Sequence, residues 1–336
     1  MKIEEYVPLS RLTTLRIGGP ARFLIQVGNE SEVREAIRFA KEQGLPFYPL
    51  GQGSNVLALD EGYTGVILKM ELPRVAFLEE EDDAIVVAEA GVSWDALVQE
   101  AARRGLWGIE NLAGIPGTVG AAPVQNIGAY GVELKDSVEW VEALEIDGGN
   151  LRRFSKDACA FAYRDSYFKR EPGHLIVRVA LRLTRQGIPH TEYPDLVRAK
   201  DASISLTTPE EIGEAVRAIR AKKFPDLTIY GTAGSFFKNP FISEDAYQAL
   251  QKHYPALPGF PTPAGVKISL AWILDHVLAL RGFSKGLVSL YEAQPLVMVA
   301  KGGATAHDVS GLAHDVVEKV QQATGIIPEW EVRTIK

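Results

Sequence analysis

The middle of the chain carries a long irregular segment that reads NLAGIPGTVGAAP (residues 111–123) and continues as QNIGAYG (residues 125–131). Its apolar residues follow neither a helical nor a strand period. Loops of this length inside a compact domain are usually functional. The small residues let backbone approach a ligand closely, and the amide side chains can pair with the edge of a heterocycle. The segment therefore predicts a ligand-binding loop; the alternative is an irregular connector.

Short strands and helices are predicted on both sides of this segment. Apolar runs predict strands over residues 21–27, 45–50, 64–70, 84–90, 138–146 and 175–183. The last two alternate like antiparallel strands with one solvated face. Apolar stripes at helical spacing predict helices over residues 31–43 and 93–105. Later helices are expected over residues 243–253, 270–277 and 307–323. A further helix begins at TPEE (residues 208–211), where threonine can cap, proline fits the first turn and glutamate completes a capping box.

The chain is long enough for two or three domains. It has 336 residues, of which 46% are hydrophobic and 24% are charged, an ordinary globular composition. The polar segment over residues 186–207, which contains proline and glycine, is the best candidate for a boundary. We therefore divide the chain into residues 1–70, 71–206 and 207–336.

Charge and cysteine content argue against several classes of protein. The formal net charge is −7, and no block of Lys and Arg suggests nucleic-acid binding. No apolar run approaches the roughly 20 residues that span a bilayer, and the first residues lack the apolar part of a signal peptide. The single cysteine, Cys159, cannot form an internal disulfide, and the six histidines show no metal-binding spacing. We expect a cytoplasmic protein without a bound metal and without membrane or nucleic-acid partners.

A second glycine loop, GQGSNV (residues 51–56), follows the predicted strand over residues 45–50. It matches the first two glycines of a dinucleotide-binding fingerprint, but Val56 stands at the third position. The residues after it are strand-like, whereas the fingerprint requires a helix there. The loop therefore does not support a Rossmann site. Two interpretations remain: a glycine turn between strands, and a nest of backbone N–H groups that faces a phosphate.

Six sequence blocks in order resemble the UDP-N-acetylenolpyruvoylglucosamine reductase family, whose members are also called UDP-N-acetylmuramate dehydrogenases. The blocks are TLRIGGPA (14–21), GQGSN (51–55), IPGTVG through YG (115–131), YRDS (163–166), AGSFFKNP (233–240) and EWEVR (329–333). The motif YPDL (193–196) resembles the tyrosine loop of the first of the family's two types. Two positions depart from the family pattern: Thr13, where asparagine is expected, and Ala271, where glycine is usual.

The resemblance implies an α+β fold with two FAD-binding subdomains of the vanillyl-alcohol-oxidase-like (PCMH) type, residues 1–70 and 71–206. A substrate-binding α+β domain, residues 207–336, would follow. It also implies non-covalent FAD with NADPH as co-substrate, and no histidine precedes His174 to form a covalent flavin link. The FAD-binding residues implied by the match are Gly51, Gln52, Gly53, Ser54, Asn55, Gly117, Thr118, Gly120, Ala121, Gln125, Asn126, Gly128, Ala129 and Tyr130.

The implied reaction is the NADPH-dependent, FAD-mediated reduction of the enolpyruvyl group of UDP-N-acetylglucosamine enolpyruvate to UDP-N-acetylmuramate, a step of peptidoglycan precursor synthesis. Arg164 matches the arginine that binds the enolpyruvyl carboxylate, and Ser235 matches the proton donor. Glu331 matches the catalytic glutamate, which would polarise the carboxylate by donating a proton. The alternatives are an ion pair of Arg164 with Asp165, a small strand residue at 235, and a solvated acid beside Arg333.

The resemblance also implies contacts to the diphosphate and uridine of the UDP-sugar. The matching residues are Tyr193, Lys223, Lys238, Asn239 and Gln294. Lysine is a usual partner of phosphate oxygens, although Lys222 and Lys223 could instead favour the dipole at a helix C-terminus. Two other functions stay open: a flavin oxidase on the same scaffold, and a non-catalytic binder of UDP-sugars. We expect the protein to act as a monomer.

Overall fold

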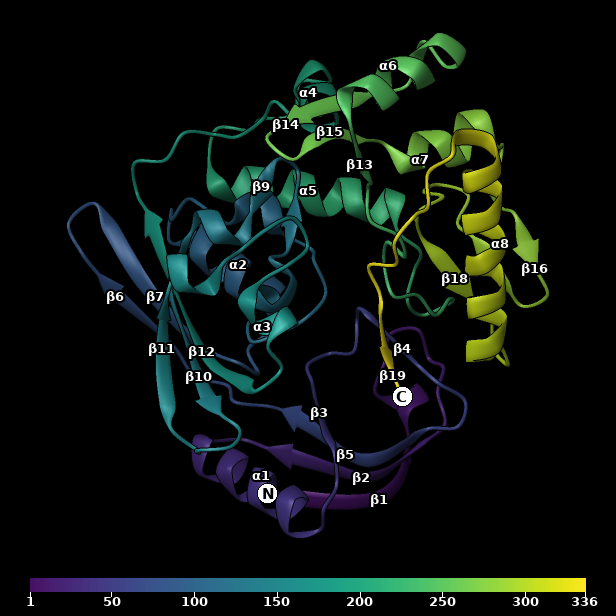
Figure 1. Cartoon of the computed structure of the whole chain (residues 1–336). Coiled ribbons are helices and arrows are strands. Elements are labelled where there is room, and N and C mark those ends of the chain that lie inside the picture. Colours follow the sequence, from purple (N-terminus) through teal and green to yellow (C-terminus); the bar gives the residue numbers. More distant parts are fainter. The chain divides into compact units, whose positions relative to one another are not determined.

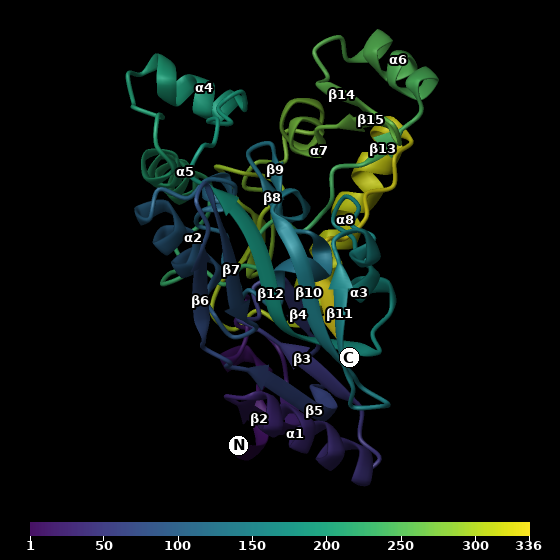
Figure 2. The ribbon, with the colours of Figure 1, turned by 90° about the vertical axis from the view of Figure 1, so that its left-hand side faces the viewer.

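The computed structural model describes residues 1–336 and contains helices, parallel strands and antiparallel strands (Figures 1 and 2). The chain forms two compact units. The first unit consists of Met1–Val7, Ala21–Gln52 and Thr64–Ala221, and the second of Pro8–Pro20, Gly53–Tyr63 and Lys222–Lys336. The chain therefore passes between the units several times. None of the helices combines the length and the apolar character needed to cross a bilayer.

The smaller sheet of the first unit has the strand order β1-β2-β5-β3. Its strands are β1 (Lys2–Pro8), β2 (Pro20–Val27), β3 (Phe47–Leu50) and β5 (Tyr63–Met70), and β3 runs parallel to β5. Helix α1 (Glu30–Glu42) begins at Asn29, whose side chain accepts a hydrogen bond from the Glu32 N–H at 3.0 Å. Val33 and Ile37 of α1 pack with Leu68 of β5 in one buried cluster. The predicted β-α-β arrangement is confirmed.

The larger sheet of the first unit is antiparallel, with the order β11-β10-β12-β7-β6. Its strands are β6 (Val75–Glu79), β7 (Asp83–Glu89), β10 (Val138–Glu145), β11 (Leu151–Ser155) and β12 (His174–Thr184). The antiparallel pairing predicted for β10 and β12 is confirmed. Along β12, Val177, Val179 and Leu181 share one buried face, on which Val177 packs with the cluster of α1 and the other two with the cluster of α2 (Trp94–Arg103). Arg178 and Arg182 lie on the opposite face and are 28% and 43% exposed, in agreement with a partly solvated face.

The predicted helix over residues 93–105 is present as α2, but its start differs from expectation. Ser93 occupies the capping position without a hydrogen bond from its side chain. The Trp94 N–H instead donates to the Gly117 carbonyl at 3.0 Å, and Ser93 forms an isolated bridge with Thr118. The irregular segment therefore satisfies the first N–H of this helix, which is a tertiary contact that local capping rules do not foresee.

The irregular segment contains only short elements, as predicted. They are the 3-10 turns Glu110–Leu112 and Ala122–Gln125 and the strand pair β8 (Gly128–Ala129) and β9 (Val132–Glu133). A 3-10 turn over Leu134–Asp136 follows, and two more short elements, the 3-10 turn Asp157–Cys159 and helix α3 (Tyr167–Arg170), precede β12.

The polar segment over residues 186–207 contains a helix that the pattern did not predict, α4 (Pro194–Asp201). Its proline lies in the first turn, and Leu196 and Ala199 are its only buried apolar residues, so the apolar stripe is too short to detect. Helix α5 (Pro209–Lys223) begins where the capping box predicts, because Thr208 and Glu211 exchange hydrogen bonds of 3.2 and 3.1 Å. Most of α5 belongs to the first unit, whereas the division from sequence starts the last domain at residue 207.

The second unit holds three small sheets. They are β13-β15-β14 (Phe241–Ile242, Gly265–Ile268, Gly259–Thr262), β16-β17-β18 (Ser284–Lys285, Val288–Leu290, Met298–Ala300) and the pair β19 (Arg333–Ile335) with β4 (Val56–Ala58). The predicted helices α6 (Glu244–His253) and α8 (Ala306–Thr324) are confirmed, and α8 begins with a capping box at Thr305. The helix predicted over residues 270–277 is α7 (Leu270–Trp272) followed by a π-helical turn, Ile273–Val277.

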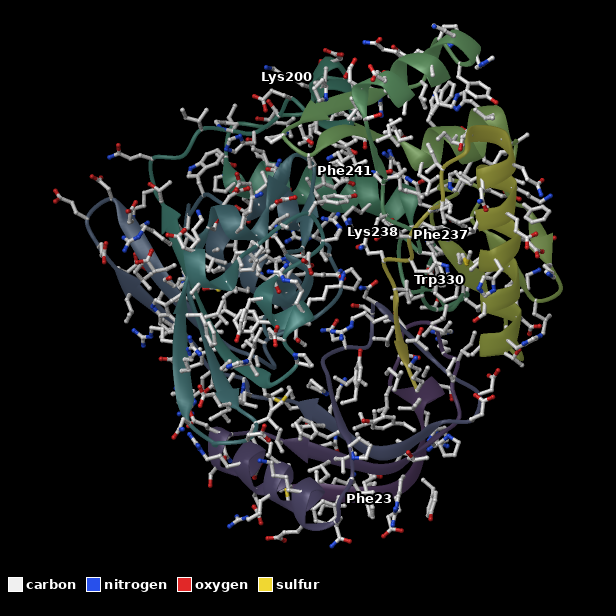
Figure 3. All side chains as sticks on the ribbon, viewed as in Figure 1. Phe23, Lys200, Phe237, Lys238, Phe241 and Trp330 are labelled. Atoms are coloured by element: carbon white, nitrogen blue, oxygen red, sulfur yellow. The ribbon has the colours of Figure 1, made fainter.

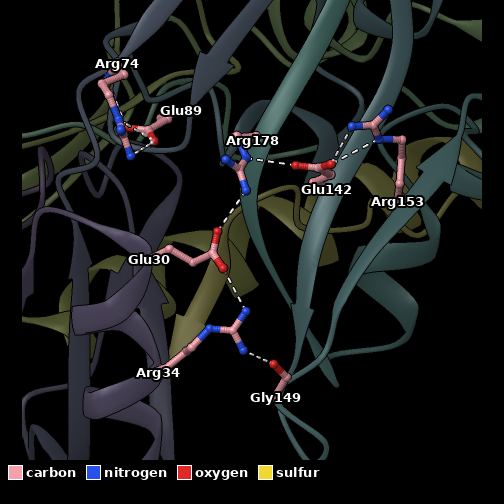
Figure 4. Close-up of polar contacts among 8 residues, drawn as sticks. All are labelled: Glu30, Arg34, Arg74, Glu89, Glu142, Gly149, Arg153 and Arg178. Atoms are coloured by element: carbon pink, nitrogen blue, oxygen red, sulfur yellow. Dashed lines mark hydrogen bonds and ion pairs between the residues drawn. The ribbon is translucent and has the colours of Figure 1, made fainter.

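A chain of ion pairs crosses the first unit (Figure 4). Glu142 of β10 accepts from Arg153 at 3.0 and 2.7 Å and from Arg178 at 2.8 Å. Arg178 also donates to Glu30 of α1 at 2.8 Å, and Glu30 accepts from Arg34 at 2.7 Å. The network thus joins α1 to the larger sheet. Glu142 is buried, with 8% of its surface exposed, so water cannot replace it as an acceptor.

We expect Glu142→Ala to lower the free energy of unfolding by about 2–3 kcal/mol, because it leaves the Arg178 guanidinium without its buried partner. Glu139→Ala is the matched control. Glu139 lies on the same strand and pairs with Arg182 at 3.0 Å, but its side chain is 37% exposed, so its loss should cost under about 1 kcal/mol. Urea unfolding of both variants measures the difference, and equal costs would contradict this account of the network.

Candidate functional site

Two glycine-bearing segments meet in the first unit. The Gly117 N–H donates to Oε1 of Gln52 at 2.9 Å. A Cβ atom added to Gly51 would lie 2.6 Å from Oγ1 of Thr118, which is closer than such atoms approach. Gly117 has a φ of +140°, which favours glycine. The segments at 51–52 and 117–118, which the sequence assigned to FAD binding, are therefore in contact through the side chains of Gln52 and Thr118.

The rest of the first glycine loop belongs to the second unit, where it lies beside the C-terminal strand. Gly53 has a φ of +67°, and a Cβ atom there would lie 2.3 Å from the Leu12 carbonyl oxygen. The Asn55 side chain donates to the Glu331 carbonyl at 3.3 Å, and the Asn55 carbonyl accepts from the Arg333 N–H at 3.1 Å. Glu331 is thereby anchored to the loop that precedes β4.

Within the irregular segment, several residues expected at the FAD site support the segment itself. Gly120 packs against Ala90, whose carbonyl accepts from the Gly120 N–H at 3.0 Å. Asn126 is fully buried, and its side-chain nitrogen donates to Glu133 at 2.9 Å and to the Ala162 carbonyl at 3.1 Å. Both N–H donors of this amide are therefore used by the protein, and a cofactor contact through them stays a prediction without support from this geometry.

Arg164 is held against the same segment. Its Nη2 atom donates to the Gly128 carbonyl at 2.7 Å, and its guanidinium carbon lies 5.2 Å from the centre of the Tyr163 ring. The backbone of Arg164 has a φ of +53°, and its carbonyl accepts from Nζ of Lys169 at 2.8 Å. Asp165 forms an ion pair with Arg170, which disfavours the alternative in which Asp165 pairs with the Arg164 guanidinium.

Tyr130 ends the irregular segment and is buried, with 8% of its surface exposed. Burial raises the pKa of Tyr130 to about 12, although the nearby Arg220 guanidinium opposes this shift. Its phenol is therefore neutral near pH 7 and available as a hydrogen-bond donor. The Tyr193 ring lies edge-on to Tyr130 at 5.2 Å between centroids, at the start of α4, and is 43% exposed.

Ser235 and Glu331 lie on neighbouring backbone segments of the second unit. Ser235 forms a β-bridge with Val297. Two residues later, Phe237 forms a β-bridge with Trp330, and these two aromatic residues are labelled in Figure 3. The Glu331 N–H donates to the Phe236 carbonyl at 2.8 Å. Phe236 and Phe237 are buried beneath these segments, which fixes the backbone on both sides of Ser235. Ser235 and Glu331 are far apart in the sequence, and antiparallel pairing brings their segments together.

The residues expected to bind the UDP-sugar in the second unit have partners that constrain them. Nζ of Lys238 pairs with Glu329 at 2.8 Å. Oδ1 of Asn239 accepts from the Leu270 N–H at 3.0 Å and so caps α7. Gln294 lies in a turn, and its backbone N–H donates to the Tyr291 carbonyl at 3.2 Å. Lys223 ends α5. The pair with Glu329 uses one of the three N–H donors of Lys238, so it does not by itself prevent a contact of Lys238 with a phosphate oxygen.

The sequence analysis missed a set of polar residues that hold the irregular segment. Oδ1 of Asp95 accepts from the Gly114 N–H at 2.6 Å and from Nε of Arg217 at 3.0 Å. Nε of Arg220 donates to the Gly114 carbonyl at 3.0 Å, and burial lowers the pKa of Arg220. A signal was present: two arginines three positions apart lie on one face of α5, although this face is otherwise apolar.

The expected site residues divide between the units. The first unit contains Gly51, Gln52, Gly117, Thr118, Gly120, Ala121, Gln125, Asn126, Gly128, Ala129, Tyr130, Arg164 and Tyr193. The second contains Gly53, Ser54, Asn55, Lys223, Ser235, Lys238, Asn239, Gln294 and Glu331. Gly51 and Gly117 carry no side chains, and the backbone around them is chemically suited to close approach by an anionic nucleotide cofactor such as FAD.

Comparisons with known proteins agree with this chemistry. A family described as FAD binding domain matches residues 21–155, and the UDP-N-acetylenolpyruvoylglucosamine reductase C-terminal domain matches residues 226–335. The chain is 42% identical over 335 residues to the UDP-N-acetylenolpyruvoylglucosamine reductase of Pseudomonas aeruginosa, with 98% of each chain covered. It is 39% identical over 334 residues to that of Bdellovibrio bacteriovorus, covering 98% of this chain and 99% of the relative.

A solved structure gives the same result. The crystal structure of UDP-N-acetylenolpyruvylglucosamine reductase from Thermus caldophilus has a TM-score of 0.69 and 28% sequence identity, with 100% of both chains covered. The predicted α+β fold with an FAD-binding domain is therefore confirmed. The chain belongs to the UDP-N-acetylenolpyruvoylglucosamine reductase family.

Proposed function

We infer that this chain is an FAD-dependent oxidoreductase that reduces the enolpyruvyl group of UDP-N-acetylglucosamine enolpyruvate to UDP-N-acetylmuramate with NADPH, in peptidoglycan precursor synthesis. The observation that carries this inference is the pairing of the segments of Ser235 and Glu331, within the region that matches the family's C-terminal domain. A binding protein has no need of a proton donor and a second acid on adjacent segments.

The test is NADPH oxidation by the FAD-loaded protein, with and without the enolpyruvyl UDP-sugar. We expect oxidation that depends on the UDP-sugar and forms UDP-N-acetylmuramate in equal amount. Oxygen uptake that ignores the UDP-sugar would instead indicate an oxidase, and UDP-sugar binding without turnover would indicate a binder.

The FAD-binding role falls to the glycine segments. We place the cofactor at Gly51–Asn55 and at the segment from Gly117 to Tyr130, with residues 1–70 and 71–206 as its two subdomains and 207–336 as the substrate domain. Non-covalent FAD supplies hydride transfer between NADPH and the substrate. The close contact of Gly51 with the Thr118 side chain supports this placement, since it brings the two glycine-bearing segments together.

Addition of a hydride to the methylene carbon of the alkene would leave negative charge on the carbon that bears the ether, next to the substrate carboxylate, and this carbon must then receive a proton. We assign this proton to Oγ of Ser235. A hydroxyl is a weak acid, so it can act only in contact with a strongly basic centre. The backbone around Ser235 is fixed by its bridge to Val297 and by buried Phe236, which favours a constant position for the hydroxyl.

Arg164 and Glu331 are assigned to the substrate carboxylate. The guanidinium of Arg164 would bind both oxygens and stabilise the developing charge. Glu331 would assist by donating a proton to the carboxylate. The hydrogen bond of Arg164 to the Gly128 carbonyl supports this role, because it orients the guanidinium plane before substrate arrives.

Tyr193, Lys223, Lys238, Asn239 and Gln294 are assigned to the diphosphate and uridine. Tyr193 begins α4, and its exposure supports assignment of this chain to the family's first type, which has the tyrosine loop. Lys238 would contact a phosphate oxygen. We further propose a monomer in the cytoplasm, where NADPH and nucleotide sugars are available.

We expect Ser235→Ala to reduce the flavin with NADPH at a near-normal rate and to slow the reoxidation of reduced flavin by the UDP-sugar about 10²–10⁴-fold. Stopped-flow absorbance resolves the two steps. Ser289→Ala, on β17 of the same unit, is the control and should leave both rates unchanged. Equal slowing of both steps in Ser235→Ala would refute the role of proton donor.

Arg164→Lys should lower the rate of substrate reduction strongly, by about 10²-fold or more, although the charge is kept, because lysine cannot bind a carboxylate in the bidentate manner. Arg170→Lys is the matched control. Arg170 lies in the same loop region and pairs with Asp165, outside the assigned site, so its variant should keep turnover near normal. Near-normal turnover in Arg164→Lys would reject the assignment.

A further inference from the structure

Lys69 is a polar exception in an otherwise apolar strand. Its neighbours Leu68 and Met70 on β5 are buried, with 1% and 5% of their surfaces exposed. Side chains alternate along a strand, so Lys69 points to the face opposite Leu68 and Met70, which pack with α1. A lysine here is not a solvated surface residue of the sheet, and its position needs another explanation.

The register of the sheet places Lys69 beside the first glycine loop. Lys69 is the partner of Leu50 in the parallel pairing of β5 with β3, and Leu50 directly precedes Gly51. Nζ of Lys69 donates to the Gly51 carbonyl. The ammonium group therefore lies where the carboxyl ends of two parallel strands meet, which is the place where open α/β sheets bind their ligands. The contact of Gly51 with Thr118 is at the same end.

The electrostatics at this point are unbalanced. Burial lowers the pKa of Lys69, and the nearby charge of Glu71 only partly opposes this effect. The direct partner of the ammonium is a neutral carbonyl, which uses one of its three donors. A cation withdrawn from water is stable only with a compensating anion or further hydrogen bonds. The chain supplies one carbonyl here, so the arrangement favours an anionic ligand.

We propose that Lys69 is a further FAD-binding residue, whose ammonium group holds the Gly51 carbonyl and contacts the anionic diphosphate of the cofactor. This rests on the proposed placement of FAD at the two glycine segments. The lysine would add a charged contact to a site that otherwise relies on backbone N–H groups. The hydrogen bond from Lys69 would also keep the Gly51 carbonyl turned away from the phosphates, because the carbonyl oxygen would repel them.

The experiment is titration of the apoprotein with FAD, followed by flavin fluorescence, for the wild-type protein and for Lys69→Met and Lys69→Arg. Lysine to methionine removes the charge with little change of volume, and we expect it to raise the Kd about tenfold or more. Arginine keeps the charge and should restore most of the affinity. Lys41→Met, at the end of α1 and paired with Asp147, is the matched control for loss of one charge and should bind FAD normally.

Salt separates the charged contact from a purely structural role. Because salt screens charges, the ratio of the Kd of Lys69→Met to that of the wild-type protein should shrink as the salt concentration rises. A ratio that stays constant with salt, or that is near one, would overturn the proposal. If the wild-type protein itself takes up no FAD, the placement of the cofactor fails; if it binds FAD and only the ratio is near one, the role of Lys69 alone fails.

Discussion

The second unit depends on one parallel strand pair, β4 with β19. This pairing joins Arg333, Thr334 and Ile335 to Val56, Leu57 and Ala58, so the end of the chain is hydrogen-bonded to a segment close to its beginning. The Thr232 N–H donates to the Thr14 carbonyl at 3.0 Å and ties in a third segment. Backbone pairing fixes both the register and the direction of β19. It therefore also fixes the position of Glu331, which lies just before this strand. The catalytic assignment therefore depends on non-local pairing.

The first unit contains a long segment that has little regular structure of its own and is held by hydrogen bonds to its backbone. Side chains from outside the segment, together with Asn111 at its start, satisfy its backbone. Nε1 of Trp94 donates to the Leu112 carbonyl at 3.0 Å, and Asn111 donates to the Tyr130 carbonyl at 2.9 Å. Asp95 and Arg220 bind the backbone of Gly114. These bonds give a glycine-rich chain a single conformation, which is the pre-organisation that a cofactor site requires.

The charges of the first unit serve two purposes. Glu142, Arg178 and Glu30 lie in a network in which every group has a partner of opposite sign, and this network joins α1 to the larger sheet (Figure 4). Lys69 instead donates to a neutral carbonyl. A charge that is paired within the protein stabilises the fold, whereas a charge with only a neutral partner is suited to pairing with a ligand. Lys238 differs from Lys69 in that it has a partner of opposite charge, Glu329, whose side chain is 74% exposed.

The sequence by itself determined the features that depend on near neighbours. Helix α1 follows from its apolar stripe, α5 follows from its capping box, and α6 and α8 lie where the sequence predicts helices. The irregular segment follows from its lack of any period. The family blocks identified Ser235, Arg164 and Glu331 as candidates. Helix α4 escaped detection because its buried stripe is too short, and the start of α2 differed because Trp94 donates to Gly117.

Only the tertiary structure decided which distant segments lie together. The pairing of Phe237 with Trp330, the contact of Gly51 with Thr118, and the position of Lys69 beside the first glycine loop join residues far apart in the chain. Hydrophobic period and capping act over a few residues, whereas strand register and buried electrostatics depend on partners that the local sequence does not specify.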